Sequence, residues 1–462
     1  MRSVPDPQEI RVPARSLHRL ARVLGADRSA QLQAAAQSAH RALGSQRVWN
    51  VNSTASGGGV AEMLHLLVGY ANAEGVDTGW VVISGDPKFF AITKRLHNRL
   101  HGAPGDDGEL GPDEVAHYRS VLDANTAFLD ERVRPGDVLI LHDPQTAGLA
   151  SHFAQRGARV VWRCHIGADR RDAWTREAWD FLLPQLSEAD AFVFSHAAFV
   201  PPELSESDVW IIEPSIDPLS AKNRPLPHQR RMEVLAQIGL VANQRSTSSG
   251  AVLGEAVPFG PDERLVVQVS RWDYLKDMLG VLHGFVEHVA GQTDARLALV
   301  GPAIDGVADD PEAERVLNEC LAAWAALPQR TRDVVRLVAL PMNDATTNAL
   351  MVNAIQRHAS VVVQKSLQEG FGLTVTESMW KSRPVVASAV GGIVDQIASG
   401  TGFLLEDPHD LDVFGRTLVS LLGQPSEMVA VGRLARQHVR RQFLTDRHLI
   451  DYARLLEHVS RS

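Results

Sequence analysis

Apolar residues in the first half of the chain fall in short unbroken runs. Each run is followed by a polar or glycine-containing turn and then by apolar residues at helical spacing. Unbroken runs, unlike alternating ones, are typical of strands that helices cover on both faces. The pattern therefore predicts a parallel sheet between two layers of helices. We expect its strands at residues 48–52, 80–83, 137–141, 160–162, 191–194 and 209–212.

This strand-and-helix pattern stops between residues 213 and 264, where proline-containing and polar sequence is typical of a domain junction and a surface loop. Near the C-terminus Leu449, Tyr452, Leu456 and Val459 form one apolar helical stripe that must pack on another element. Between these two segments the pattern resumes, with strands expected at residues 265–269, 297–301, 334–337, 360–363 and 384–387.

The two halves predict an α/β protein with two Rossmann-like, doubly wound domains that face a cleft. We expect the first domain over residues 1–217 plus a returning helix within 441–462, and the second over residues 218–440. The first 45 residues look helical and charged and carry no motif that we can interpret. In open α/β sheets ligands bind at the carboxyl ends of the strands, so a site is expected in the turns that follow them.

The composition excludes several classes of protein. The 462 residues include 46 Lys and Arg against 55 Asp and Glu, a net charge of −9, which argues against a nucleic-acid partner bound through a basic surface. Two cysteines cannot form a disulfide framework, which favours a reducing compartment. The sequence has neither an apolar run of about 18 residues nor a signal-peptide pattern at its start. We therefore expect a cytoplasmic protein without a membrane partner.

The first glycine motif is Gly57, Gly58 and Gly59, which lies between an expected strand and an amphipathic helix. Glycines let a ligand approach the backbone closely, and the N-terminus of a helix attracts an anion such as a phosphate. A simple chain-reversing turn is an equally good interpretation of three glycines. The motif is neither the dinucleotide-binding fingerprint nor a P-loop.

A pair of cations follows the first strand of the second half. Arg271 and Lys276 lie on one strand-to-helix turn, where Arg could bind two oxygens of a diphosphate and Lys could add a point charge. Two solvated surface charges are the alternative interpretation.

The segment at residues 364–377 carries the most chemical information. A strand ends, a turn containing Glu369, Gly370, Phe371 and Gly372 follows, and a helix is expected to begin near Leu373. The backbone N–H groups from Phe371 to Thr374 would point at a phosphate or sugar oxygen, and the carboxylates of Glu369 and Glu377 would accept hydrogen bonds from hydroxyls. This combination predicts a sugar-nucleotide site rather than a helix cap beside a surface glutamate.

In the first half, polar residues end two successive strands. His142 and Asp143 follow one strand, and His165 ends the next, so the three should converge on the expected cleft. We find no metal-ligand spacing in the sequence and predict no metal site.

The motifs around Arg271, Lys276, Glu369 and Glu377 resemble those of retaining GT-B-fold glycosyltransferases of the sucrose-synthase-like and glycogen-synthase-like group. Residues 52–62, 163–166, 214–223 and 370–377 are similar to stretches of glycosyltransferring trehalose synthases, and the likeness runs from about residue 46 to the C-terminus. Lys365, Gln368 and the loop at residues 241–262 depart from that pattern, and we expect Lys365 and Gln368 to flank the donor site.

This resemblance implies a hexosyltransferase that moves glucose from ADP-, UDP- or GDP-glucose to a small sugar acceptor, glucose itself, giving trehalose. It implies that Arg271 and Lys276 stabilise the leaving diphosphate, helped by the glycines at residues 57–59. Glu369 would hold sugar hydroxyls, Glu377 the ribose, His165 the transferred sugar and Asp143 the acceptor. No cofactor and no obligatory metal are implied.

Alternatives remain open at this point. A trehalose phosphorylase would place inorganic phosphate where the nucleotide diphosphate lies, and a non-catalytic sensor would bind the nucleotide sugar without turnover. An NAD-dependent oxidoreductase is disfavoured because its fingerprint is absent. The nucleotide, the acceptor and a homodimeric state are left open.

Overall fold

The computed structural model describes residues 6–55, 58–106, 108–242, 251–254, 257–304 and 311–461. The chain forms two compact units, unit 1 with Met1–Ser215 and Leu444–Ser462, and unit 2 with Ile216–Phe443. The expected divisions were residues 1–217 with 441–462, and residues 218–440. The ligand assigned to each domain stays a prediction.

Unit 1 is built on a seven-stranded sheet with the strand order β1-β3-β2-β4-β5-β6-β7. All neighbouring strands are parallel except β1, which pairs antiparallel with β3 at the edge. The strands are β1 (Gln8–Glu9), β2 (Val48–Asn52), β3 (Thr78–Val82), β4 (Val138–His142), β5 (Arg159–Cys164), β6 (Ala191–Phe194) and β7 (Val209–Ile211).

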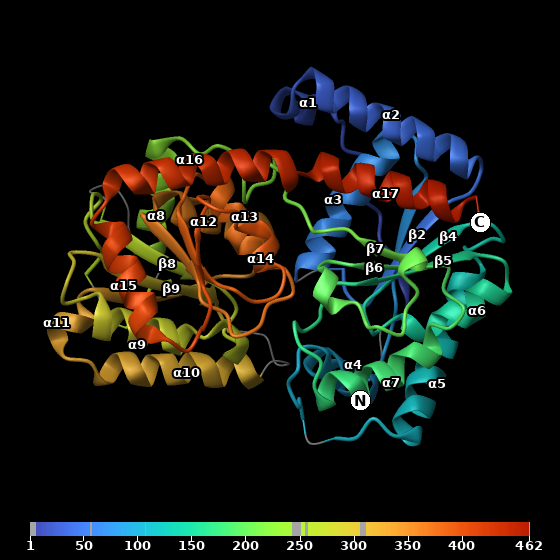
Figure 1. The fold of residues 1–462 in the computed structure, drawn as a ribbon, viewed down its shortest axis with the longest axis horizontal. Coiled ribbons are helices and arrows are strands. Elements are labelled where there is room, and N and C mark those ends of the chain that lie inside the picture. The colour runs from blue at the N-terminus through green and yellow to red at the C-terminus, as the bar shows by residue number, and fades with distance from the viewer. Residues whose placement is uncertain are drawn as a thin grey trace. The chain divides into compact units, whose positions relative to one another are not determined.

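Helices cover both faces of this sheet (Figure 1). The helices of unit 1 are α1 (His18–Leu24), α2 (Ala26–Leu43), α3 (Gly59–Ala73), α4 (Pro87–Leu100), α5 (Pro112–Asp130), α6 (Ala150–Gln155), α7 (Ala173–Leu182) and α17 (Thr445–Val459). Alternate strand residues point to opposite faces. Trp49 and Val51 therefore pack with α4, α5, α6 and α7, whereas Val48 packs with α2 and α17.

The C-terminal helix α17 carries the apolar stripe that we expected to pack on the first domain. Its Leu456 and Val459 are buried in one cluster with Val138 and Val161 of the sheet of unit 1. The helix also packs lengthwise against α2, and the Asp446 carboxylate forms an ion pair of 2.6 Å with Arg28. The chain therefore leaves unit 1 after Ser215 and completes that unit's core only after residue 443.

Unit 2 is built on a six-stranded sheet, all parallel, with the order β10-β9-β8-β11-β12-β13. Its strands are β8 (Leu265–Val269), β9 (Arg296–Pro302), β10 (Val335–Leu340), β11 (Val361–Gln364), β12 (Val385–Ser388) and β13 (Phe403–Leu405). The order in which the strands are added to the sheet reverses at β8, which lies between β9 and β11. In open α/β sheets such a switch point opens a crevice at the carboxyl ends of the strands.

Unit 2 also has helices on both faces of its sheet (Figure 1). They are α8 (His228–Ile238), α9 (Met278–His288), α10 (Pro311–Ala326), α11 (Gln329–Arg332), α12 (Ala345–His358), α13 (Leu373–Trp380), α14 (Ile393–Gln396), α15 (Leu411–Leu422) and α16 (Pro425–Gln442). Helices α9, α10 and α15 share one buried cluster with the sheet, while α8 packs on α12 and α13 packs on α16. Among the described residues, no helix is long and apolar enough to cross a membrane.

Candidate active site

The turn after β8 carries the two predicted cations, and their environments differ. Asp273 caps the short helix at Tyr274–Lys276, and its Oδ1 accepts a hydrogen bond of 2.8 Å from the Leu275 N–H. The Arg271 side chain is 57% exposed and pairs with Asp273 at 3.0 Å. The Lys276 side chain is only 13% exposed. A carboxylate from the turn after the neighbouring strand β11 pairs with Lys276 and covers much of its side chain.

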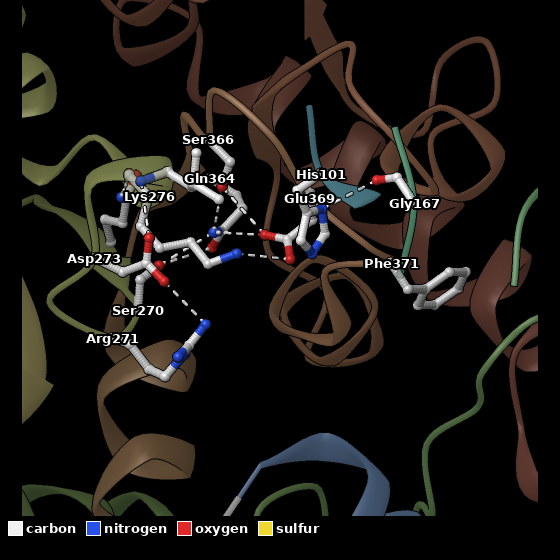
Figure 2. Close-up of polar contacts among 12 residues, drawn as sticks. His101, Gly167, Ser270, Arg271, Asp273, Lys276, Gln364, Ser366, Glu369 and Phe371 are labelled. Atoms are coloured by element: carbon white, nitrogen blue, oxygen red, sulfur yellow. Dashed lines mark hydrogen bonds and ion pairs between the residues drawn. The ribbon is translucent and has the colours of Figure 1, made fainter. Parts of the chain in front are cut away.

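That carboxylate belongs to Glu369, whose Oε1 accepts a hydrogen bond of 2.8 Å from Lys276 Nζ (Figure 2). Ser366 Oγ and Gln364 Nε2 donate to Glu369 Oε2 at 3.1 and 3.4 Å. The Leu367 N–H donates to the carbonyl of Leu275 at 2.8 Å, which ties the turn after β11 to the turn after β8. The structure thus brings two predicted site residues, Lys276 and Glu369, into direct contact.

The glycine turn after Glu369 is held from behind by Gln396, which is fully buried. The Gln396 amide donates to the carbonyls of Gly392, at 3.1 Å, and Phe371, and its oxygen accepts from the Thr376 N–H at 2.9 Å. The Phe371 ring lies apart from the Lys276–Glu369 pair in Figure 2 and packs against Phe443. Only the backbone of Phe371 therefore suits the predicted ligand contact.

Glycine is required at two positions, one in this turn and one in the turn after β12 that packs against it. Gly372, with φ of 81°, lies in the left-handed region and caps α13, which begins at Leu373 as the sequence indicated. Gly391 also has a positive φ, of 51°, and a Cβ there would overlap the carbonyl oxygen of Glu369. The close approach of residue 391 fixes the backbone from which Glu369 projects.

Glu377, in the middle of α13, was predicted to hold the ribose. Its side chain is 8% exposed and its Oε1 lies 3.6 Å from Lys222 Nζ. No sequence motif pointed to a role for Lys222. The described contacts do not join Glu377 to Glu369 or Lys276, so Glu377 is a separate acidic position on the helix that follows the glycine turn.

Lys365 was expected to flank the donor, and the structure corrects this. Its side chain is 1% exposed, and its ammonium pairs with the Asp277 carboxylate and donates to the carbonyl of Pro408 at 2.6 Å. Asp277 follows Lys276 directly, has a φ of 47° and caps α9 by accepting from the Gly280 N–H at 3.0 Å. Lys365 therefore supports the turn that carries Lys276 from inside the protein.

The glycine motif of unit 1 is described in part, because Gly57 lies outside the described residues. Gly58 has a φ of 86° and precedes α3, which begins at Gly59. A Cβ at Gly58 would meet no atom within 4 Å. The conformation of the backbone, rather than close packing, accounts for glycine at residue 58.

Asp143 and His165, which follow β4 and β5, are in direct contact. The His165 N–H donates to Asp143 Oδ1 at 2.8 Å, and Asp143 has a φ of 62°. A left-handed conformation is uncommon for a residue other than glycine and is often found at functional positions. The pairing of β4 with β5, which aligns His142 with Arg163, brings the two strand ends together.

His142 and His165 are joined in a chain of hydrogen bonds, and the partners in this chain determine the tautomer of each ring. Asn50 Nδ2 donates to the carbonyl of Gly79 at 3.4 Å, so Asn50 Oδ1 is the acceptor for His142 Nε2 at 3.1 Å. Burial lowers the pKa of His142 to about 3, and the Arg163 guanidinium acts in the same direction. Neutral His142 then accepts at Nδ1 from His165 Nε2, 3.0 Å away.

Burial also lowers the pKa of His165 well below its ordinary value, with Arg163 and His142 acting in the same direction. Since the Nε2 atom of neutral His165 carries the proton, its Nδ1 is a hydrogen-bond acceptor. An acceptor of this kind suits a sugar hydroxyl. Asn50 was missed in the sequence because it lies inside a strand, where an isolated polar residue gives no motif.

The carboxyl group of Asp143 has a strongly shifted pKa. Burial raises its pKa to about 7, although the His165 N–H and Arg163 oppose the shift. An unfolded aspartate titrates near 4, so between about pH 4 and pH 7 the folded protein keeps a proton that the unfolded chain releases. This group's contribution to stability is therefore present at low pH and is lost as the pH rises through 7.

We expect the stability difference between the parent and Asp143→Asn to depend on pH in that window. Raising the pH from 4 to 7.5 should lower the free energy of unfolding of the parent, relative to the variant, by roughly 2 kcal/mol. A pKa difference of about 3 corresponds to roughly 4 kcal/mol, and partial exposure of Asp143 reduces it. Urea unfolding at several pH values measures this, and parallel pH profiles would contradict the assignment.

Across the described ranges, no group of three or more His, Cys, Asp or Glu side chains could hold a metal ion. In unit 2, Arg271 and Lys276 are two cationic side chains on the turn where an anionic ligand is predicted to bind.

The architecture defines the class of protein. Residues 263–424 match the family model described as glycosyl transferases group 1. Among solved structures, an α,α-trehalose-phosphate synthase (UDP-forming) from Burkholderia vietnamiensis is similar, with a TM-score of 0.67 and 16% identity over 90% of this chain and 99% of that chain. With two parallel α/β sheets, the fold is that of a GT-B glycosyltransferase.

The family follows from the sequence comparisons. Residues 50–201 match the model described as trehalose synthase, N-terminal domain. The chain is 35% identical over 414 residues to a trehalose synthase of Rubrobacter xylanophilus, covering 88% of this chain and 89% of that protein. It is 27% identical to a trehalose phosphorylase of Pleurotus pulmonarius, covering 84% of this chain and 54% of that protein. The chain belongs to the trehalose synthase family of glycosyltransferases, which confirms the predicted resemblance.

Proposed function

We propose that this protein transfers glucose from a nucleoside-diphosphate glucose to glucose with retention of the anomeric configuration, giving trehalose. The observation that carries the proposal is the contact between Lys276 and Glu369 at the neighbouring carboxyl ends of β8 and β11. A cation positioned by a carboxylate at a switch point suits the diphosphate of a sugar nucleotide.

In this proposal the acceptor hydroxyl attacks the anomeric carbon on the face from which the diphosphate leaves. The carbon–oxygen bond to the diphosphate breaks, the bond to the acceptor oxygen forms, and the hydroxyl proton passes to a diphosphate oxygen. No protein nucleophile is required. The residues bind and orient both sugars, and Arg271 and Lys276 stabilise the charge that develops on the leaving group.

The two units supply different contacts in this proposal. Glu369 positions Lys276 and accepts hydrogen bonds from sugar hydroxyls, and Glu377 binds the ribose. In unit 1, His165 Nδ1 accepts from a hydroxyl of the transferred glucose, and Asp143 binds the acceptor sugar.

A matrix of donors and acceptors tests the reaction. ADP-, UDP- and GDP-glucose are each incubated with glucose, glucose 6-phosphate and small polyols, and the products are separated and their anomeric configuration assigned. We expect trehalose from at least one donor with glucose. Transfer to glucose 6-phosphate alone would contradict the proposed acceptor, and hydrolysis without transfer would contradict the reaction.

A trehalose phosphorylase is the second candidate, supported by the similarity to the protein of Pleurotus pulmonarius. Inorganic phosphate would then bind beside Arg271 and Lys276 and release glucose 1-phosphate from trehalose. Incubation with trehalose and phosphate, in the absence of nucleotide, distinguishes the two reactions because only the phosphorylase forms glucose 1-phosphate.

The role proposed for Asp143 gives a further prediction. Asp143→Asn should lower the transfer rate at saturating donor by about tenfold or more, because the amide cannot replace a carboxylate in a charged hydrogen bond to the acceptor hydroxyl. The affinity for the nucleotide, measured by calorimetry, should change less than twofold to threefold, roughly the size of an indirect effect. Equal transfer rates in parent and variant would remove Asp143 from the acceptor site.

A further inference from the structure

A compact turn at residues 217–224 begins unit 2 and lies outside the residues assigned so far. The carbonyl of Asp217 accepts from Ser220 Oγ at 3.0 Å and from Asn223 Nδ2 at 3.2 Å, while Asp217 Oδ1 accepts from the Leu219 N–H at 2.8 Å. Asp217 and Asn223 are 1% and 3% exposed. The turn is therefore closed by its own buried polar groups.

Side chains from α12 and α13 hold this turn in place. Arg357 and Trp380 donate to the carbonyl of Asn223 at 2.8 and 3.2 Å. The buried Lys381 ammonium donates to Asn223 Oδ1 at 3.0 Å, to Gln356 Oε1 at 2.7 Å and to the carbonyl of Glu377 at 3.0 Å. One lysine thus connects the turn directly to the backbone of Glu377.

Because these hydrogen bonds fix Asn223, they also fix the position of Lys222, the residue before it. Its Nζ lies 3.6 Å from Glu377 Oε1, and the two side chains are 21% and 8% exposed. A nearly buried carboxylate is unfavourable without a nearby cation, and the Lys222 ammonium is such a cation for Glu377. The separation is longer than a hydrogen bond, which allows a ligand hydroxyl to contact both groups.

We propose that Lys222 is a specificity-determining residue of the donor site, where it binds a ribose hydroxyl of the nucleotide together with Glu377. The inference rests on the proposed function, which places the ribose at Glu377. A vicinal diol fits this ion pair because one hydroxyl donates to the carboxylate while its oxygen, or that of its neighbour, accepts from the ammonium. A nucleotide without these hydroxyls would make neither contact.

Nucleotide binding by the intact protein tests the inference. The dissociation constants of ADP, UDP and GDP are measured first, and the tightest is then compared with its 2′,3′-dideoxy form. The variants are Lys222→Met, Lys222→Arg and Lys94→Met, the last a control on an exposed part of α4. Thermal unfolding of each variant shows whether the fold is kept.

We expect Lys222→Met to weaken binding of the ribonucleotide by about tenfold to a hundredfold, the effect of losing a hydrogen bond to a charged group. Binding of the dideoxy nucleotide should change little, so the preference for ribose falls. Lys222→Arg should retain most of that preference, and Lys94→Met all of it.

Other results would overturn the inference. If Lys222→Met and Lys222→Arg weakened binding of the ribonucleotide and of its dideoxy form equally, Lys222 would act on the diphosphate or on the fold. Unchanged binding in both variants would place Lys222 outside the site while leaving the proposed function intact. Failure of the parent to bind ADP, UDP or GDP would instead overturn the proposed function, and the inference with it.

Discussion

Replacing Arg271 or Lys276 with alanine is expected to lower turnover, at saturating donor and acceptor, by about a hundredfold to a thousandfold each. Charge accumulates on the diphosphate as the glycosidic bond breaks, so a positioned cation binds the transition state more tightly than the substrate. Loss of one such preorganised donor typically costs a rate factor of about that size. Steady-state kinetics with the donor identified in the matrix experiment measures the effect.

The two variants should differ in stability, which separates a catalytic role from a structural one. Arg271 is 57% exposed, so Arg271→Ala should leave the midpoint of thermal unfolding nearly unchanged. Lys276→Ala removes the partner of a carboxylate that is only 12% exposed and should lower that midpoint. Arg271→Lys should also be impaired, because an ammonium cannot contact two oxygens in the manner of a guanidinium. Turnover close to that of the parent in both alanine variants would exclude these residues from the mechanism.

The largest expected loss of stability follows from Lys365→Met. This substitution leaves the Asp277 carboxylate without its buried partner, and breaking such a pair from one side typically costs about 3–5 kcal/mol. Because Asp277 follows Lys276 and caps α9, we also expect lower turnover in whatever fraction stays folded. Urea unfolding gives the change in stability.

A double variant supplies the matched control. Asp277→Asn keeps an oxygen for the Gly280 N–H, and asparagine tolerates the left-handed conformation at residue 277. Combined with Lys365→Met it removes both charges, so we expect the double variant to regain at least half of the lost stability. A double variant no more stable than Lys365→Met alone would show that the ammonium acts through Pro408 rather than through Asp277.

Much of the fold could be predicted because strands buried on both faces give unbroken apolar runs. The runs at residues 48–52, 191–194 and 265–269 coincide with β2, β6 and β8. The edge strand β1 was missed because Gln8–Glu9 are polar, and β13 was missed because its apolar run, Phe403–Leu405, is only three residues long. The antiparallel direction of β1 likewise depends on its pairing with β3 and not on its composition.

The site was predictable where a motif coincides with a strand end. That rule selected Lys276, Glu369, Asp143 and His165, and the structure joins them as two contacting pairs. It could not select Gln396, which acts from the end of α14 through side-chain hydrogen bonds to the backbone. It misplaced Lys365, because a sequence does not show whether a lysine at a strand end points outward or into a buried ion pair.

The position of unit 2 within the chain has a consequence for the order of folding. Unit 1 closes its core only when α17 joins α2, and the Arg28–Asp446 pair spans 418 positions of sequence. If residues 216–443 were still unstructured, closing that loop would cost about 5 kcal/mol from its length alone. In folded unit 2, by contrast, the Ile216 N–H bonds the carbonyl of Phe443 at 2.9 Å, so the two ends of the insertion are already adjacent. A nascent chain should therefore complete its inserted unit first and dock its last helix afterwards.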